Sequence, residues 1–185
     1  MLIDITMKIT PQMIKDSPGK DNKALSGHVG THFDAMSREF PLDYTQRSGI
    51  VFDVSSIRDR DISISDIDFD AVQPEMFVAF YSGFAEEVGY EGKTYFTQHP
   101  QLSHELIDAL VEKGVSILAL DFAGIRRGKE HVPKDQYCAD RGTFVVENLC
   151  GLKQLVDRGG RFKANTYPMS FTEATGLPCR VIAEL

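Results

Sequence analysis

A helix pattern followed at once by an apolar run sets the fold class of this chain. Residues 103–113 carry an apolar stripe at helical spacing, with Ser103 placed as an N-cap and Gly114 placed to end the helix. Residues 115–120 then form an apolar run that ends at Asp121. Such a strand is typical of a sheet buried on both faces, so we expect an α/β unit here.

Further runs of strand length occur on both sides of this unit. They cover residues 2–8, 49–54, 76–81, 143–146, 162–167 and 179–184, and one helical turn is expected at 152–156. The polar segment 12–22 predicts a loop, whereas segment 55–73 fits a strand pair or a short helix equally well. We see no repeat or linker. The prediction is one mixed α/β domain over residues 1–185, rich in strands and with few helices.

Composition narrows the functional classes. A length of 185 residues, 42% hydrophobic and 25% charged, is ordinary for one soluble globular domain. The net charge of −7, with scattered Lys and Arg, disfavours nucleic acid as a partner. No apolar run reaches the length of a membrane span, and the N-terminus lacks a signal-peptide pattern. Three widely spaced cysteines indicate reduced thiols, so we expect a cytoplasmic protein.

The segment His28-Val-Gly-Thr-His32-Phe-Asp34 is the strongest chemical signal, because it holds two of the five histidines and a carboxylate within seven residues. Imidazole and carboxylate form a usual ligand set for a divalent transition metal, zinc first and manganese second. The segment alternates His, Gly, His and Asp with Val, Thr and Phe, which predicts a strand whose polar face turns toward a site. A surface strand that carries these residues by chance remains the alternative.

Geometry adds a condition on this strand. In a straight strand the Cα atoms of His28 and His32 would lie roughly 13 Å apart, at about 3.3 Å per residue. That is near the limit at which both imidazoles can reach one metal at roughly 2.0–2.1 Å. We therefore expect the chain to curve or bulge at Gly30, where no side chain opposes it.

With its complete His-x-Gly-Thr-His-x-Asp signature, the chain resembles the metal-dependent cyclase and kynurenine formamidase family of hydrolases. Further matching segments follow in the same order: Tyr81-Ser-Gly-Phe84, His99-Pro-Gln-Leu-Ser103, Ile117-Leu-Ala-Leu-Asp121 and Val146-Glu-Asn-Leu149. The resemblance covers about residues 2–156. It implies a compact α/β fold in which His28, His32 and Asp34 are metal ligands, joined by Glu147 from a later strand.

Two positions depart from the family pattern. Arg38 stands where many members carry a further histidine, and Asp135 stands where another histidine usually precedes the glutamate by twelve residues. His131 and Asp140 lie close by in the sequence and offer substitute donors. A mononuclear centre is thus the simpler expectation, with Asp135 as a further candidate ligand.

The resemblance implies a hydrolase that uses metal-activated water to cleave a carbon–nitrogen bond in a small amide, a formamide such as an N-formylkynurenine-like compound, or a cyclic amide. Asp34 and Glu147 are expected to orient the water while ligating. Arg38 cannot act as an acid or base, but it can clamp a substrate carboxylate or stabilise an oxyanion, which predicts a carboxylate-bearing substrate.

Two other functional classes stay open. One is a metal-binding protein without hydrolase activity, favoured by Arg38 and Asp135, and the other is a lyase. Family members are commonly homodimers or larger, so a homo-oligomer is expected.

Overall fold

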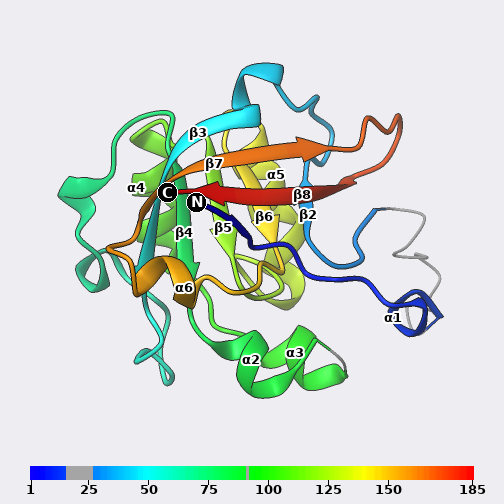
Figure 1. The fold of residues 1–185 in the computed structure, drawn as a ribbon, viewed down its shortest axis with the longest axis horizontal. Coiled ribbons are helices and arrows are strands. Elements are labelled where there is room, and N and C mark those ends of the chain that lie inside the picture. Colours follow the sequence, from blue (N-terminus) through cyan, green and yellow to red (C-terminus); the bar gives the residue numbers. More distant parts are fainter. Residues whose placement is uncertain (16–26, 91) are drawn as a thin grey trace.

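Seven strands close into a barrel in the part of the chain that this computed structural model describes, residues 1–15, 27–90 and 92–185. The order is β8-β2-β6-β5-β4-β3-β7, and β7 pairs in turn with β8 (Figure 1). The strands are β1 (Leu2–Asp4), β2 (His32–Asp34), β3 (Gln46–Asp53), β4 (Phe77–Tyr81), β5 (Ile117–Leu120), β6 (Phe144–Glu147), β7 (Arg161–Pro168) and β8 (Gly176–Glu184). Successive parts of β8 pair with β2 and with β1, so β1 lengthens this wall.

The helices of the described chain are short. They are α1 (Pro11–Lys15), α2 (Phe84–Val88), α3 (Lys93–Gln98), α4 (His104–Glu112), α5 (His131–Ala139) and α6 (Lys153–Val156), with 3₁₀ turns η1 (Leu42–Thr45), η2 (Ile64–Asp66), η3 (Phe69–Ala71) and η4 (Gly128–Glu130). None of them is long and apolar enough to span a membrane. The predicted strand-rich, mixed α/β fold with few helices is confirmed.

Strands β3 to β6 run parallel, and two apolar cores lie on their two faces. One core fills the barrel with side chains from all seven strands, and the other lies between the outer face and α4. The Ser103 side chain caps α4 by accepting from the Leu106 amide at 3.1 Å. Leu106, Ile107 and Leu110 of α4 are fully buried, and each contributes about 1.5–3 kcal/mol. The predicted helix–strand unit therefore anchors the outer layer.

Several expected elements differ from the structure. Of the segment 12–22, residues 12–15 belong to helix α1 rather than to a loop, and residues 16–22 lie outside the described residues. The undecided segment 55–73 forms the two 3₁₀ turns η2 and η3. Helices α2, α3 and α5 were not predicted, because they are short and bury few apolar side chains.

The chain ends lie side by side on the barrel. The Met1 amino group donates to the Leu185 carbonyl at 2.9 Å, beside the pairing of β1 with β8 (Figure 1).

Candidate metal centre

Strand β2 turns His32 and Asp34 to the outside of the barrel. Phe33, between them, packs in the barrel core, and alternation along the strand sends its two neighbours to the other face. Both are only 2% exposed. The strand begins at His32, not at His28, because the chain turns at Gly30, which has φ +69°. The curvature expected at Gly30 is thus present.

This turn brings His28 back toward the strand. His28 Nε2 lies 3.2 Å from Asp34 Oδ1, and His32 Nε2 lies 3.6 Å from the same oxygen. The two imidazole rings are 4.9 Å apart and nearly perpendicular. At φ +69°, Gly30 has a left-handed backbone conformation that residues with a Cβ rarely adopt, and a Cβ there would also push on the Ile9 side chain at 2.7 Å. The three motif residues therefore converge as a ligand group.

Strand β6 supplies Glu147 directly opposite His32 in the antiparallel pair of β2 and β6. Glu147 Oε2 lies 3.6 Å from His32 Nε2. Helix α5 adds His131 and Asp135, which are four residues apart and so share one helix face. His131 Nε2 lies 3.2 Å from Asp135 Oδ2 and 3.4 Å from Glu147 Oε1.

The donor atoms form two groups that share one carboxylate. The first group is His28, His32 and Asp34, and the second is Asp34, His131, Asp135 and Glu147; within each group the donors lie within 4.8 Å of one another. Sequence reasoning favoured a single group with Glu147 as its fourth ligand. The two overlapping groups could hold one cation or two, so the mononuclear centre stays a prediction, and His131 adds a donor that the sequence left open. In the sequence, the four-residue spacing of His131 and Asp135 was the feature that could have indicated His131 as a ligand.

Several buried metal-ligating atoms of the site have no hydrogen-bond partner in the described part of the chain, which fits a bound cation. His32 Nδ1 lies 2.9 Å from the Gly30 carbonyl, which can only accept, so Nδ1 holds the proton and the neutral ring presents its Nε2 lone pair to the site. Among the described residues, His32 Nε2, Asp34 Oδ2 and Asp135 Oδ1 have no hydrogen-bond partner although they are buried. Buried acceptors facing one another are unfavourable unless a cation compensates them.

The pKa values of Asp34 and Asp135 are shifted in opposite directions. Burial, and after it the negative charge of Asp34, raises the pKa of Asp135 well above its ordinary value. Burial also acts to raise the pKa of Asp34, but the adjacent His28 and His32 imidazoles outweigh it and hold that pKa below its usual range. A divalent cation between the two groups would favour the ionised form of Asp135 as well as that of Asp34.

A hydrogen-bonded layer behind the ligands fixes the turn at Gly30. Asn148 Nδ2 donates to the Gly30 carbonyl at 2.9 Å, and Tyr95 Oη donates to Asn148 Oδ1 at 2.9 Å. The Gly30 amide donates to Tyr90 Oη at 3.0 Å, and Thr31 Oγ1 donates to the Asn148 carbonyl at 2.7 Å. Because the Gly30 carbonyl also accepts a hydrogen bond from His32 Nδ1, this layer orients the His32 ring.

Arg38 does not reach the metal cavity, contrary to the expectation from its position in the motif. Its amide donates to the Ala35 carbonyl at 2.9 Å in a tight turn after β2, in which Met36 has φ +56°. Its side chain is 54% exposed and pairs with Asp140, Nη2 to Oδ1 at 2.7 Å. Asp140 is likewise drawn away from the cavity, and of the described residues Asp135 and His131 supply that side of the site.

The fold and these residues define a barrel protein with a candidate metal centre on its outer face. A family model described as "Putative cyclase" matches residues 3–126, and the chain belongs to this family. The family indicated by the His-x-Gly-Thr-His-x-Asp signature is confirmed. No curated protein matches the chain.

Solved structures share the fold over nearly the whole chain. "The Structure Of Potential Metal-Dependent Hydrolase With Cyclase Activity" is 22% identical, with a TM-score of 0.76, and the match covers 99% of this chain and 96% of that one. Isatin hydrolase A from Ralstonia solanacearum is 15% identical, with a TM-score of 0.77 and coverage of 99% and 91%. An isatin hydrolase bound to the product analogue thioisatinate is 15% identical, with a TM-score of 0.76 and coverage of 98% and 91%.

Proposed function

We propose that this protein is a metal-dependent hydrolase that cleaves a carbon–nitrogen bond in a small, neutral cyclic amide. The observation that carries the proposal is a cavity of about 600 Å³ with the two ligand groups in its wall. The volume is within the range of small-molecule sites. The solved isatin hydrolase with its bound product analogue supports the choice of a cyclic amide.

The rest of the cavity wall matches a neutral, mostly apolar ligand. It contains Met36, Phe96, Ala123, Val132 and Thr175 besides the ligand groups and Asn148. Among the described residues that line it, none is Lys or Arg. A substrate carboxylate would therefore meet the carboxylates of the site without a fixed cationic side chain, which disfavours the acidic substrate expected from Arg38.

A divalent cation held by the two groups would act as a Lewis acid, polarising the amide carbonyl and lowering the pKa of water. His28 and His32 contribute neutral nitrogen donors, and Asp34 supplies the charge common to both groups. Asp135 and Glu147 provide carboxylate oxygens that can hold the proton released by water. Met36 and Phe96, half-buried in the cavity wall, would help to exclude bulk water from a bound substrate.

The test is ring opening of isatin by purified protein loaded with Zn²⁺ or Mn²⁺, followed by absorbance. An N-formyl aromatic amine and a linear anilide serve as comparison substrates, and the metal-free protein is the blank. A higher kcat/KM for isatin than for either comparison substrate supports the proposal. A higher kcat/KM for the N-formyl compound would indicate a formamidase instead. Bound metal without turnover of any substrate would favour the alternative of a metal-binding protein without hydrolase activity. Arg38, in place of a histidine, is the feature that favours this alternative.

Replacement of Arg38 by Met is expected to leave kcat/KM near the wild-type value for neutral and for carboxylate-bearing substrates. The Arg38–Asp140 pair is exposed to solvent, so its loss should change the free energy of unfolding little. Steady-state kinetics with an amide and its carboxylated analogue measure this. A KM raised only for the carboxylated compound would restore the role of Arg38 as a carboxylate clamp.

The homo-oligomer and the cytoplasmic location stay predictions. Near the C-terminus, Val181 is fully buried in the barrel core, whereas Leu185 is 40% exposed and free to pack on another subunit. Exposed apolar side chains of β1 and of the chain around β7, such as Leu2, Tyr167 and Met169, support a homodimer through this wall.

A further inference from the structure

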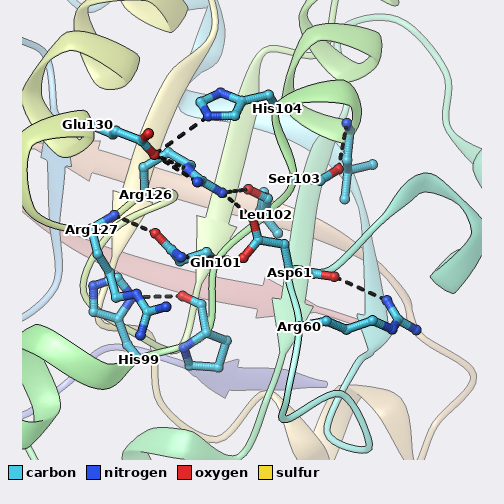
Figure 2. A network of polar contacts seen from close by, with 12 residues as sticks. Arg60, Asp61, His99, Gln101, Leu102, Ser103, His104, Arg126, Arg127 and Glu130 are labelled. Atoms are coloured by element: carbon cyan, nitrogen blue, oxygen red, sulfur yellow. Dashed lines mark hydrogen bonds and ion pairs between the residues drawn. The ribbon is translucent and has the colours of Figure 1, made fainter.

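Arg126 is a buried cation at the junction of three chain segments beside the metal centre. Its side chain is 9% exposed. Nη1 donates to Asp61 Oδ2 at 2.5 Å and to the Leu102 carbonyl at 2.8 Å, while Nε and Nη2 contact Glu130 Oε2 at 2.8 and 2.7 Å (Figure 2). One guanidinium thus joins the loop before η2, the start of α4 and the 3₁₀ turn η4.

Two of the partners of Arg126, Leu102 and Asp61, make further hydrogen bonds in their own segments. The Leu102 amide donates to the Ile125 carbonyl at 3.1 Å. The Arg127 amide donates to Gln101 Oε1 at 2.8 Å (Figure 2). Gln101 Nε2 also donates to Asp61 at 3.3 Å. Asp61 and Leu102 are thus tied to neighbouring segments by further hydrogen bonds. Glu130, whose side chain is 52% exposed, is held by Arg126 and by the exposed His104, Nε2 to Oε2 at 3.5 Å.

Glu130 directly precedes His131, the first residue of α5. The start of this helix has few anchors: no side chain caps its N-terminus, and its buried residues Asp135, Cys138 and Ala139 lie further along. Lys134 Nζ pairs with Asp108 of α4 at 2.7 Å and fixes the middle of the helix. The placement of His131, at the first position of α5, therefore depends in part on what holds Glu130.

The other ligand group has no such dependence. His28, His32 and Asp34 are placed by β2, by its pairing with β6 and β8, and by the layer around Asn148. None of the contacts of Arg126 given above involves these elements. Loss of the guanidinium would leave Asp61 and Glu130 without their shared cation, and the exposed His104 imidazole, 3.5 Å from Glu130 Oε2, would hold that carboxylate more loosely.

We propose that Arg126 is a positioning residue for the His131–Asp135 half of the metal centre and acts on it through Glu130. The inference rests on the proposed function, because it assigns two separable metal positions to that site. It predicts that the two halves lose metal affinity independently. The half built on α5 depends on Arg126, and the half built on β2 does not.

The experiment compares Arg126→Met with wild type by Zn²⁺ titration of the metal-free, full-length protein against a chromogenic chelator. Arg126→Met should lower the affinity of one of two Zn²⁺ positions by about 10–100-fold, the usual effect of removing an outer support, and leave the other unchanged. Arg126→Lys should fall between, since one ammonium cannot serve both carboxylates as the planar guanidinium does. Arg180→Met is the matched control, because it removes a 2.6 Å pair with Asp4 far along the chain from α5.

A second measurement does not require metal. Long-range ¹H–¹⁵N spectra of the histidine side chains in the metal-free protein should show the His131 signals displaced in Arg126→Met and those of His28 and His32 unmoved. Unchanged Zn²⁺ affinities together with unmoved His131 signals would overturn the inference, as would equal loss at both positions. Failure of wild type to bind Zn²⁺ would sink the proposed function, and the histidine spectra would still decide whether Arg126 positions His131.

Discussion

Replacement of Asp34 by Asn should remove metal from both ligand groups and lower kcat/KM by at least about 10³-fold. Asp34 is the one carboxylate common to the two groups, and it lies 3.2 Å from His28 and 3.6 Å from His32. An amide keeps the shape of the side chain and removes its charge. Loss of a single electrostatic donor in an active site costs about 10²–10³-fold, and this residue would serve two cations.

Asp135→Asn is the matched control, because Asp135 belongs to the second group only. Its variant should keep about one metal per chain at the His28, His32 and Asp34 group. Elemental analysis after neutral-pH purification counts the metals, and the isatin assay gives the rate. Full metal content in Asp34→Asn would remove the shared carboxylate from the centre.

The parts of the fold that follow from local pattern could be predicted. The cap at Ser103, the apolar stripe of α4 and the buried run of β5 act within a few residues of one another, so the sequence displays them directly. Helix α5 escaped prediction because its buried face carries Asp135 rather than a row of large apolar residues. Periodicity of apolar side chains cannot reveal a helix that turns polar groups toward a site.

The site was predictable where one short segment supplies the ligands. His28, His32 and Asp34 lie within a single turn and strand, and the need for curvature at Gly30 follows from the reach of two imidazoles. The role of His131 was harder to see, because it requires knowing that residues 131–139 are helical and thus that His131 and Asp135 share a face.

Arg38 shows the limit of transferring a position from one protein to another. The aligned position marks a place along the chain, but the direction of the side chain depends on the backbone between it and the strand. Here Met36 adopts a left-handed conformation, and the turn that closes on Arg38 directs the guanidinium to Asp140 at the surface. A guanidinium in the cavity would also have competed with a metal for the same carboxylates.

Removal of metal by a chelator is expected to lower the melting temperature by about 8–16 °C. Binding at one site with free metal at about 1,000 times Kd stabilises the folded state by about 4.1 kcal/mol. In a chain of this size about 1 kcal/mol corresponds to about 2–4 °C. The physical source is the buried cluster of Asp34, Asp135 and Glu147, which a cation neutralises in the folded state and which unfolding would return to water.

Differential scanning fluorimetry of wild type before and after chelation, with re-addition of Zn²⁺ or Mn²⁺, measures this shift. Recovery by one metal at lower concentration than the other would identify the preferred ion. Asp34→Asn provides the control, because a variant that holds no metal should melt at the same temperature with and without chelator. The contrary result is a wild-type protein that has lost its metal, as elemental analysis shows, and keeps its melting temperature. It would mean that these carboxylates are compensated without a cation, and it would contradict the two-group metal centre.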